Sequence, residues 1–80
     1  MPTDAASGRV VKRSLVIAGH STSISIEDAF WLRLRRIALE RGVSLNRLAA
    51  MVDASRGDAN LSSAIRVFVL EAESAARPDQ

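Results

Sequence analysis

The stretch HSTSISIEDAFW, residues 20–31, decides the fold. In its first half Thr22, Ile24 and Ile26 alternate with serines, which is the two-residue period of a strand with one apolar face. Without a glycine or proline break the chain continues into Glu-Asp-Ala-Phe-Trp, which is typical of a helix start. A single short strand is not stable alone. Its isoleucine face therefore needs a covering layer, and its backbone needs a partner strand.

A candidate partner strand lies just before this stretch. Residues 14–18, SLVIA, are short and β-branched, and Gly19-His20-Ser21 is typical of a turn, in which we place His20. The two segments could pair as a hairpin within one chain. They could also form one long bent ribbon that pairs with a second chain. The sequence leaves both arrangements open.

Three helices are predicted after the strands, over residues 27–41, 45–54 and 61–75. Ser44 and Asn60 are suitable N-caps for the second and third helices. The first and third helices also carry apolar residues opposite their main apolar stripes: Leu32, Leu39, Val67 and Leu70. Helices of this kind are usually covered on two sides. These four side chains could bury one another within a dimer, or join dimers into a tetramer or hexamer.

Length and composition limit the classes of protein that fit. Eighty residues allow one small domain, and a chain this short buries only about 60% of its unfolded surface, so it is marginal as a monomer. Because cysteine is absent, disulfides and thiolate metal sites are excluded. Oligomerisation is a common remaining source of stability. No cofactor motif is present, and the single histidine has no evident second metal ligand.

Membrane, secretory and enzymatic functions are not indicated. No apolar run approaches the roughly 20 residues that span a bilayer. The N-terminal sequence MPTDAASGRVVKRS has its acidic residue before its basic cluster, the wrong order for a secretory signal. No glycine-rich phosphate loop or pair of catalytic carboxylates is evident. We therefore expect a cytoplasmic bacterial protein that is not an enzyme.

Basic residues gather near the N-terminus. The net charge is only +2, but ten of the eleven basic residues are arginine, which suits phosphate contact. We expect residues 1–11 to form a flexible basic arm, residues 12–75 the domain and residues 76–80 a disordered tail. Just before the first predicted strand lie Arg9, Lys12 and Arg13. They could follow a DNA backbone, or they could simply improve solubility.

The order of these elements resembles a known superfamily. The run KRSLVIAGHSTSISIEDAFWLRLRRIALERGVSLNRLAAMVD, followed by NLSSAIRVFVL, is similar to the ribbon-helix-helix superfamily of bacterial transcription regulators. It is more similar to a group of small bacterial ribbon-helix-helix domain proteins of poorly defined function. The resemblance covers residues 12 to about 70. It implies a mainly α fold with a short β-ribbon, built as a ribbon-helix-helix dimer with an additional C-terminal helix over residues 61–75.

The resemblance also implies a dimer core. In the superfamily two chains pair their strands antiparallel, and four helices pack behind the ribbon. Residues carried over to this core are Ile24, Ile26, Phe30, Trp31, Leu34 and Leu48. A lone strand has unpaired backbone groups on both edges, which a symmetry mate would pair. We expect an obligate homodimer, with Trp31 in the core or interface rather than stacked on a base.

Two DNA contacts follow from the resemblance. Family ribbons enter the major groove, where the base-facing residues here would be Ser21, Ser23 and Ser25. Serine discriminates poorly between base edges, and family members commonly have longer side chains there. The turn before the second helix resembles the family's phosphate anchor, with Val43, Ser44, Leu45 and Arg47. Alternatively, Ser44 only caps the helix.

Two functions therefore remain in competition. The first is a DNA-binding transcriptional regulator that docks a dimeric β-ribbon in the major groove. The second is an oligomeric scaffold or interaction protein on the same fold, with weak or no DNA binding. A small-ligand site at an interface is a third class, but no motif supports it.

Overall fold

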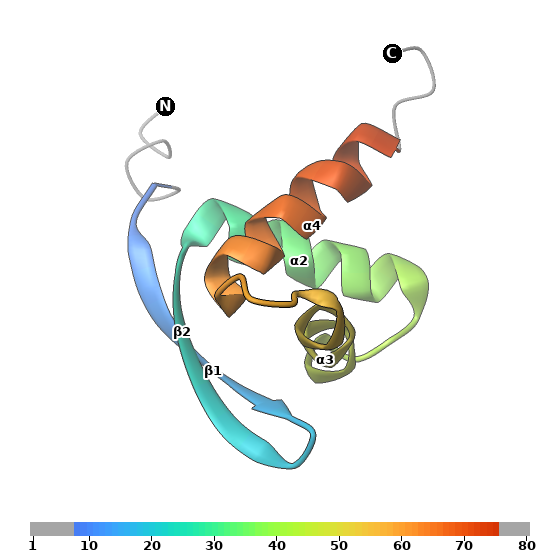
Figure 1. Ribbon diagram of the computed structural model, residues 1–80. Helices are drawn as coiled ribbons and strands as arrows, with labels where there is room; N and C mark the ends of the chain where they lie inside the picture. Colours follow the sequence, from blue (N-terminus) through green and yellow to red (C-terminus); the bar gives the residue numbers. More distant parts are fainter. Residues whose placement is uncertain (1–7, 76–80) are drawn as a thin grey trace.

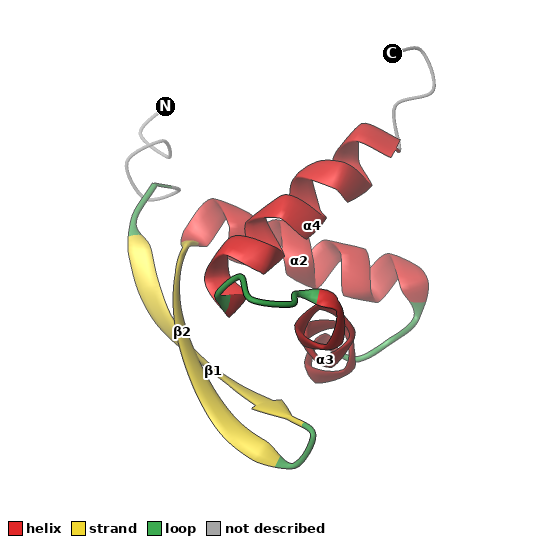
Figure 2. Ribbon diagram, viewed as in Figure 1, coloured by secondary structure: helices red, strands yellow, loops and turns green. Residues whose placement is uncertain are grey.

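A two-stranded antiparallel ribbon curves along one side of three helices (Figure 1, Figure 2). The computed structural model describes residues 8–75. Its elements are β1 Val10–Ile17, β2 His20–Glu27, α2 Asp28–Arg41, α3 Leu45–Ser55 and α4 Leu61–Ala75. This mainly α architecture, with a ribbon and an additional C-terminal helix, confirms the predicted fold class. Most of the predicted arm (residues 1–7) and the predicted tail (76–80) lie outside the described residues.

The ribbon is a hairpin made by one chain. β1 pairs with β2 from Val10 opposite Glu27 to Ile17 opposite His20. The two linking residues, Ala18 and Gly19, have φ values of 52° and 80°. Positive φ at both central residues matches the two-residue turn whose twist suits a hairpin. The structure thus selects pairing within the chain, and it corrects the turn: His20 opens β2 instead of lying in the turn.

β1 begins four residues earlier than the predicted strand of residues 14–18. Val10 and Val11 are β-branched and suit a strand. The Asp28 amide donates to the Arg9 carbonyl at 2.8 Å, which continues the ladder beyond Val10. The predicted arm of residues 1–11 was therefore wrong for Val10 and Val11, and the placement of Lys12 and Arg13 before the strand was wrong as well, because all four residues lie inside β1.

The hairpin turn has an unfavourable residue that can be improved. Ala18 occupies the left-handed region, where a side chain other than asparagine, aspartate or glycine costs roughly 1–2 kcal/mol. Ala18→Asn is expected to raise the free energy of unfolding by about 0.5–1 kcal/mol, because Asn-Gly is the preferred pair for this turn. Urea denaturation followed by circular dichroism would measure the gain. Ala54→Asn, at an exposed position on α3, is the control. A neutral or destabilising effect of Ala18→Asn would contradict this turn geometry.

The inner face of the ribbon packs on the helices to form one core. Leu15 and Ile17 of β1 join Ile24 and Ile26 of β2 on this face. The residues predicted for a dimer core lie in this single-chain core: Ile24, Ile26, Trp31, Leu34 and Leu48 are buried, and Phe30 packs partly buried against them. Their burial does not require a second chain, because β1 supplies the second strand. Dimerisation itself stays a prediction.

The helix ends agree with the sequence to within one residue. α2 begins at Asp28 and ends before Gly42, whose φ of 70° makes it the C-terminal cap. α3 extends to Ser55, one residue beyond the prediction, and α4 has the predicted bounds. Among residues 8–75, no helix is long and apolar enough to cross a membrane, and no cluster of three or more potential ligands is placed to hold a metal ion.

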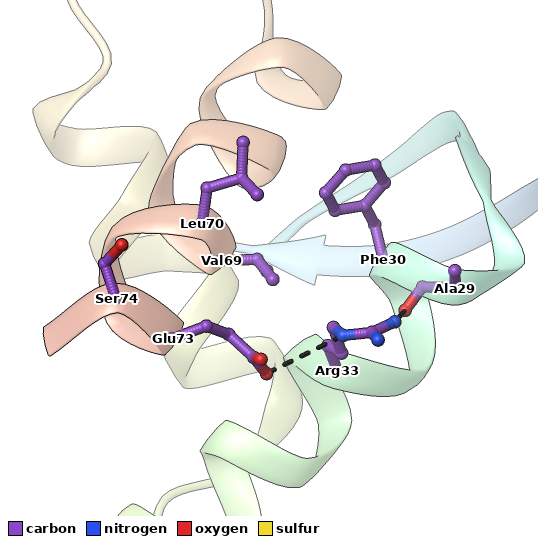
Figure 3. A pocket seen from close by; sticks show the side chains of 7 residues that line it. All are labelled: Ala29, Phe30, Arg33, Val69, Leu70, Glu73 and Ser74. Carbon is purple, nitrogen blue, oxygen red and sulfur yellow. Dashed lines mark hydrogen bonds and ion pairs between the residues drawn. The ribbon is translucent and has the colours of Figure 1, made fainter. Parts of the chain in front are cut away.

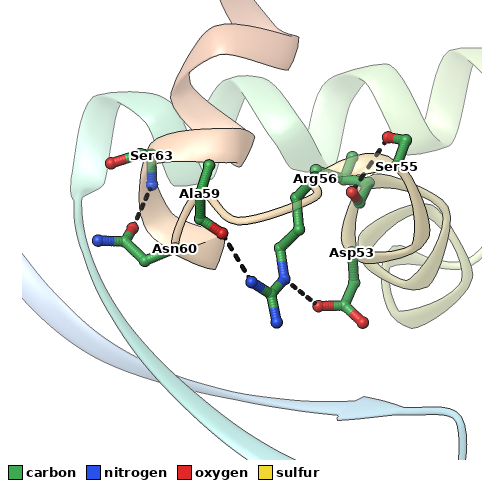
Figure 4. Close-up of polar contacts among 7 residues, drawn as sticks. Asp53, Ser55, Arg56, Ala59, Asn60 and Ser63 are labelled. Carbon is green, nitrogen blue, oxygen red and sulfur yellow. Dashed lines mark hydrogen bonds and ion pairs between the residues drawn. The ribbon is translucent and has the colours of Figure 1, made fainter.

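A polar network fixes the loop between α3 and α4 (Figure 4). Arg56 donates from Nε to Asp53 Oδ1 at 2.6 Å and from Nη1 to the Ala59 carbonyl, also at 2.6 Å. Asn60 caps α4 by accepting from the Ser63 amide at 2.9 Å. These bonds set where α4 starts, which brings its first turn to the ribbon.

Candidate nucleic-acid interface

The outer face of the ribbon carries small polar side chains. Ser21, Ser23 and Ser25 are all exposed there, on the side away from the helices. Their cross-strand partners are Val16, Ser14 and Lys12, which are exposed as well. We call these six residues the outer ribbon face. Opposed residues in such pairs lie close together, so the face is a continuous strip of serines with one lysine at one end and one valine at the other.

Half of this face was missed by the sequence analysis. Ser14 and Val16 were placed in a strand but not on a functional surface, and Lys12 was assigned to an arm. The signal was present in the alternation of VKRSLVI, in which these three residues alternate with Arg13, Leu15 and Ile17. Starting the strand at Val10 would have assigned them to one face.

Each ribbon edge is held by the first turn of a helix. The Val16 amide, at the free edge of β1, donates to Asn46 Oδ1 in α3 at 3.1 Å. The Ser25 carbonyl, at the free edge of β2, accepts from Ser62 Oγ in α4 at 3.0 Å. α3 thus begins beside β1, and α4 begins beside β2. Neither Asn46 nor Ser62 was among the site residues predicted from sequence.

At the start of α3, not every residue of the predicted phosphate anchor has a backbone amide that is free to bind a phosphate. The Val43 amide already donates to the Ala38 carbonyl at 3.0 Å, since it belongs to the cap that ends α2. The Arg47 amide donates to Ser44 Oγ at 3.0 Å, so Ser44 is an N-cap. The side chains of Val43 and Leu45 pack against the core. At this helix start, the backbone amides of Ser44, Leu45 and Asn46 make no hydrogen bond within residues 8–75.

The outer ribbon face and the α3 start adjoin each other. A shallow hollow of about 220 Å³ lies where they meet. Its lining includes Ser14, Val16, Ser21 and Ser23 from the outer ribbon face, together with Asn46 of α3. The structure therefore brings the predicted base-facing serines Ser21 and Ser23 next to the first turn of α3, which holds the predicted anchor.

Arg13 is turned away from this surface. Its Nη2 lies 2.6 Å from Asp28 Oδ1, and its guanidinium carbon lies 5.3 Å from the centre of the Trp31 ring. Its position on β1 is opposite Ile24 on the inner side of the ribbon. The prediction that Arg13 belongs to a DNA-following arm is corrected for this reason, because its charge is used to join β1 to the start of α2. Trp31 is buried beneath it.

The exposed cations nearest the candidate surface are therefore few. Lys12 lies on the outer ribbon face, and Arg47 is exposed in the first turn of α3. Arg9 is exposed directly before β1. None of the three takes part in an ion pair within the described part of the chain.

A second ion pair joins α4 to Glu27, the last residue of β2. Arg66 Nε donates to Glu27 Oε1 at 2.8 Å. This hydrogen bond lowers the pKa of the Glu27 carboxyl below its ordinary value, and the Glu27 backbone amide acts in the same direction. A carboxyl with a lowered folded pKa stabilises the fold above its unfolded pKa, and this contribution is lost as the pH falls through the lowered value. The contact is thus an acid-sensitive tie between α4 and the end of β2.

Comparison with known families agrees with this architecture. Residues 10–72, which run from the start of β1 well into α4, match the family model described as a ribbon-helix-helix domain. The chain belongs to the ribbon-helix-helix domain family. Such domains generally bind DNA as transcription regulators, typically form dimers and are typically not enzymes.

A solved structure is similar to this ribbon-helix-helix chain. An uncharacterized protein from Bordetella pertussis Tohama I superposes with a TM-score of 0.73 at 31% sequence identity. The match covers 88% of the present chain and 60% of the Bordetella chain, so the present chain spans well under the full length of that protein. No curated protein matches the chain.

Proposed function

We propose that the protein binds DNA as a transcriptional regulator and inserts its outer ribbon face into the major groove. The observation that supports this most strongly is the exposed two-stranded ribbon with a polar outer face, since the major groove, about 12 Å wide, admits a two-stranded β-ribbon. The family generally has this activity. In this proposal one chain supplies both strands of the ribbon, and the homodimer predicted from sequence would place two such ribbons on one DNA.

The start of α3 would contact a phosphate beside the groove. Amide groups of Ser44, Leu45 and Asn46 have no partner among residues 8–75, and they lie at the positive end of the α3 dipole. Arg47 adds a full positive charge in the same turn. The bond from Val16 to Asn46 fixes this turn relative to the ribbon. A phosphate contact and a groove contact could therefore be made together.

The chemistry of the outer ribbon face favours affinity over discrimination. Serine hydroxyls donate and accept, so Ser21, Ser23 and Ser25 fit several base edges. Lys12 is the one cation on the outer ribbon face, and a lysine contacts phosphate as a point charge. We expect the backbone contacts to supply most of the binding free energy, and different duplex sequences to bind with similar affinity.

The proposal predicts salt-dependent binding to random duplex DNA. Anisotropy of a labelled duplex, titrated at several salt concentrations, should give a linear fall of log affinity with log salt. Lys12→Ala with Arg47→Ala should lower the slope by about 2, or about 1 for each lost phosphate contact. The matched control is Arg33→Ala with Arg41→Ala, which removes the same charge from the side of α2 that faces α4.

Two results would contradict the proposal. The first is no binding by the unmodified protein at low salt. The second is an equal change of slope in the α2 control, which would mean that net charge, and not the ribbon with α3, attracts the DNA. Because all four altered side chains are exposed, we expect each variant to fold like the unmodified protein. The thermal transition of each variant would verify this.

The second candidate is an oligomeric interaction protein with weak or no DNA binding. The observation that favours it is the exposure of large apolar side chains on helices, with Leu39 at 81% and Leu70 at 59%. Because the Arg13 side chain lies on the inner side of the ribbon and pairs with Asp28, the outer ribbon face is also less basic than predicted. Assemblies larger than a dimer, together with failure to bind DNA at low salt, would select this candidate.

A further inference from the structure

α2 presents one regular stripe of side chains to solvent. Its members recur at the spacing of a single helix face, and we call them the α2 outer face: Leu32, Arg35, Arg36 and Leu39. The two leucines are 50% and 81% exposed. The two arginines make no ion pair with any described residue. Exposed leucines at helical spacing indicate a face that a partner covers.

α4 presents a stripe with the same spacing and the opposite charge. We call it the α4 outer face: Val67, Leu70, Glu71 and Ser74. Val67 and Leu70 are 52% and 59% exposed. Glu71 is exposed and forms no ion pair between residues 8 and 75. The charge of this face is therefore complementary to that of the α2 outer face.

One flank of the α4 outer face is hollow, on the side of α2. A depression of about 400 Å³ separates Leu70 from Phe30 at the start of α2 (Figure 3). Figure 3 shows both side chains bordering this space, with the Arg33–Glu73 ion pair, at 3.8 Å, crossing one end. The hollow is large enough for a leucine side chain, and its walls are mixed: Phe30, Val69 and Leu70 are apolar, whereas Arg33, Glu73 and Ser74 are polar or charged.

The other flank is hollow as well, on the side of α3. A depression of about 300 Å³ is bordered by Val67, Phe68 and Glu71 of α4, with Val52 of α3 behind them. The α4 outer face is thus a ridge with a hollow on each side, and both hollows are lined by apolar and polar side chains.

These two faces do not meet within one chain. α2 contacts α4 through Arg33, which pairs with Glu73, and through Arg41, which lies 5.2 Å from the Phe68 ring centre, while Phe30 borders the hollow between the two helices. At about 100° per residue these three side chains lie on a different side of α2 from Leu32 and Leu39. The two outer faces can be covered by each other only when a second copy of the chain is present.

We propose that the α2 outer face of one copy packs on the α4 outer face of the next, head to tail. Leu32 and Leu39 are two helical turns apart, about 10.5 Å, which is close to the 10–12 Å width of a helix. The two leucines can therefore straddle the α4 ridge and enter one hollow each. Arg35 and Arg36 lie between them, and in this arrangement they face Glu71 of the other copy.

Charge disfavours a contact in which either outer face packs on the same face of a second copy. Two α2 outer faces would place Arg35 and Arg36 against the same arginines of a second copy, and two α4 outer faces would leave Glu71 without a cation on the opposing face. Like charges at a contact disfavour that partner. When this contact is not returned between the same two copies, it leaves one face of each kind free and extends into a ring or a chain of copies. The contact does not depend on DNA binding.

Sedimentation of the full chain tests this contact. Each face consists of four side chains, fewer than the roughly 20–30 residues on each side of a stable complex, so we expect the mass to rise with concentration between about 1 µM and 1 mM. Leu39→Glu and Leu70→Glu should each weaken self-association at least about tenfold. Met51→Glu is the matched control, because Met51 is 51% exposed on α3 and outside both faces. Thermal unfolding would verify that each variant is folded.

Mixing the two defective variants gives the decisive result. Leu39→Glu retains an intact α4 outer face, and Leu70→Glu retains an intact α2 outer face. A mixture should therefore form species larger than a dimer, although neither variant alone should grow beyond the dimer that is expected from the sequence. The proposal is overturned if the unmodified chain does not grow beyond a dimer up to about 1 mM, if Leu39→Glu alone still grows beyond a dimer, or if the mixture does not grow beyond a dimer.

Discussion

Leu48→Ala is expected to remove a large part of the stability of the fold, about 2–5 kcal/mol of the free energy of unfolding. The Leu48 side chain is 0% exposed. It lies on α3, which packs against β1, α2 and α4, so the cavity would open where all these elements meet. A domain of this length typically has only about 4–12 kcal/mol of stability in total. The variant should unfold at a much lower urea concentration.

Met51→Ala is the matched control for this prediction. It shortens an apolar side chain on the same helix, but one that is 51% exposed. Its effect should stay within about 0.5 kcal/mol. Circular dichroism at several urea concentrations would measure both variants. If Leu48→Ala cost no more than Met51→Ala, the packing of α3 against the ribbon would be incorrect.

A disulfide between Ser14→Cys and Ser23→Cys is expected to form within one chain. The two residues are direct partners across the hairpin, and opposed residues of this kind have Cα atoms about 4.5–5.5 Å apart, within the range that a disulfide spans. The chain contains no cysteine, so no other disulfide can interfere. Closing this short loop should add about 2–3 kcal/mol to the free energy of unfolding.

The same variant tests whether β1 and β2 belong to one chain. Non-reducing gels and mass spectrometry at low protein concentration should show a cross-linked monomer, and reduction should remove the added stability. Ser23→Cys alone is the control, since it has no partner thiol in its own chain. Predominance of disulfide-linked dimers in the double variant would mean that the strands pair between chains.

The periodic parts of the fold were predictable from sequence. Alternation of Thr22, Ile24 and Ile26 with serines set the faces of β2, and capping residues at Ser44 and Asn60 set the starts of α3 and α4. These signals are local, because each depends on neighbours within one helical turn or along one strand. The structure confirms the helices to within one residue at each end.

The non-local parts were not predictable. The turn sequence Ala18-Gly19 lacks the asparagine that most clearly marks a two-residue hairpin, so pairing within the chain and between chains looked equal. Arg13 follows another basic residue and was therefore interpreted as part of an arm. Its true environment depends on Asp28 and Trp31, which are distant in sequence. Likewise, the Val43 amide donates to the Ala38 carbonyl in the cap that ends α2, and this hydrogen bond is evident only from the backbone geometry.

A hairpin built from neighbouring segments also changes how the protein comes to be folded. Two strands separated by two residues meet by closing a very short loop, a local event that does not wait for an encounter with another molecule. Formation of the ribbon is then a unimolecular step, whether or not the folded chain goes on to pair with a second copy. Any later pairing of copies would then join chains whose ribbons are already formed.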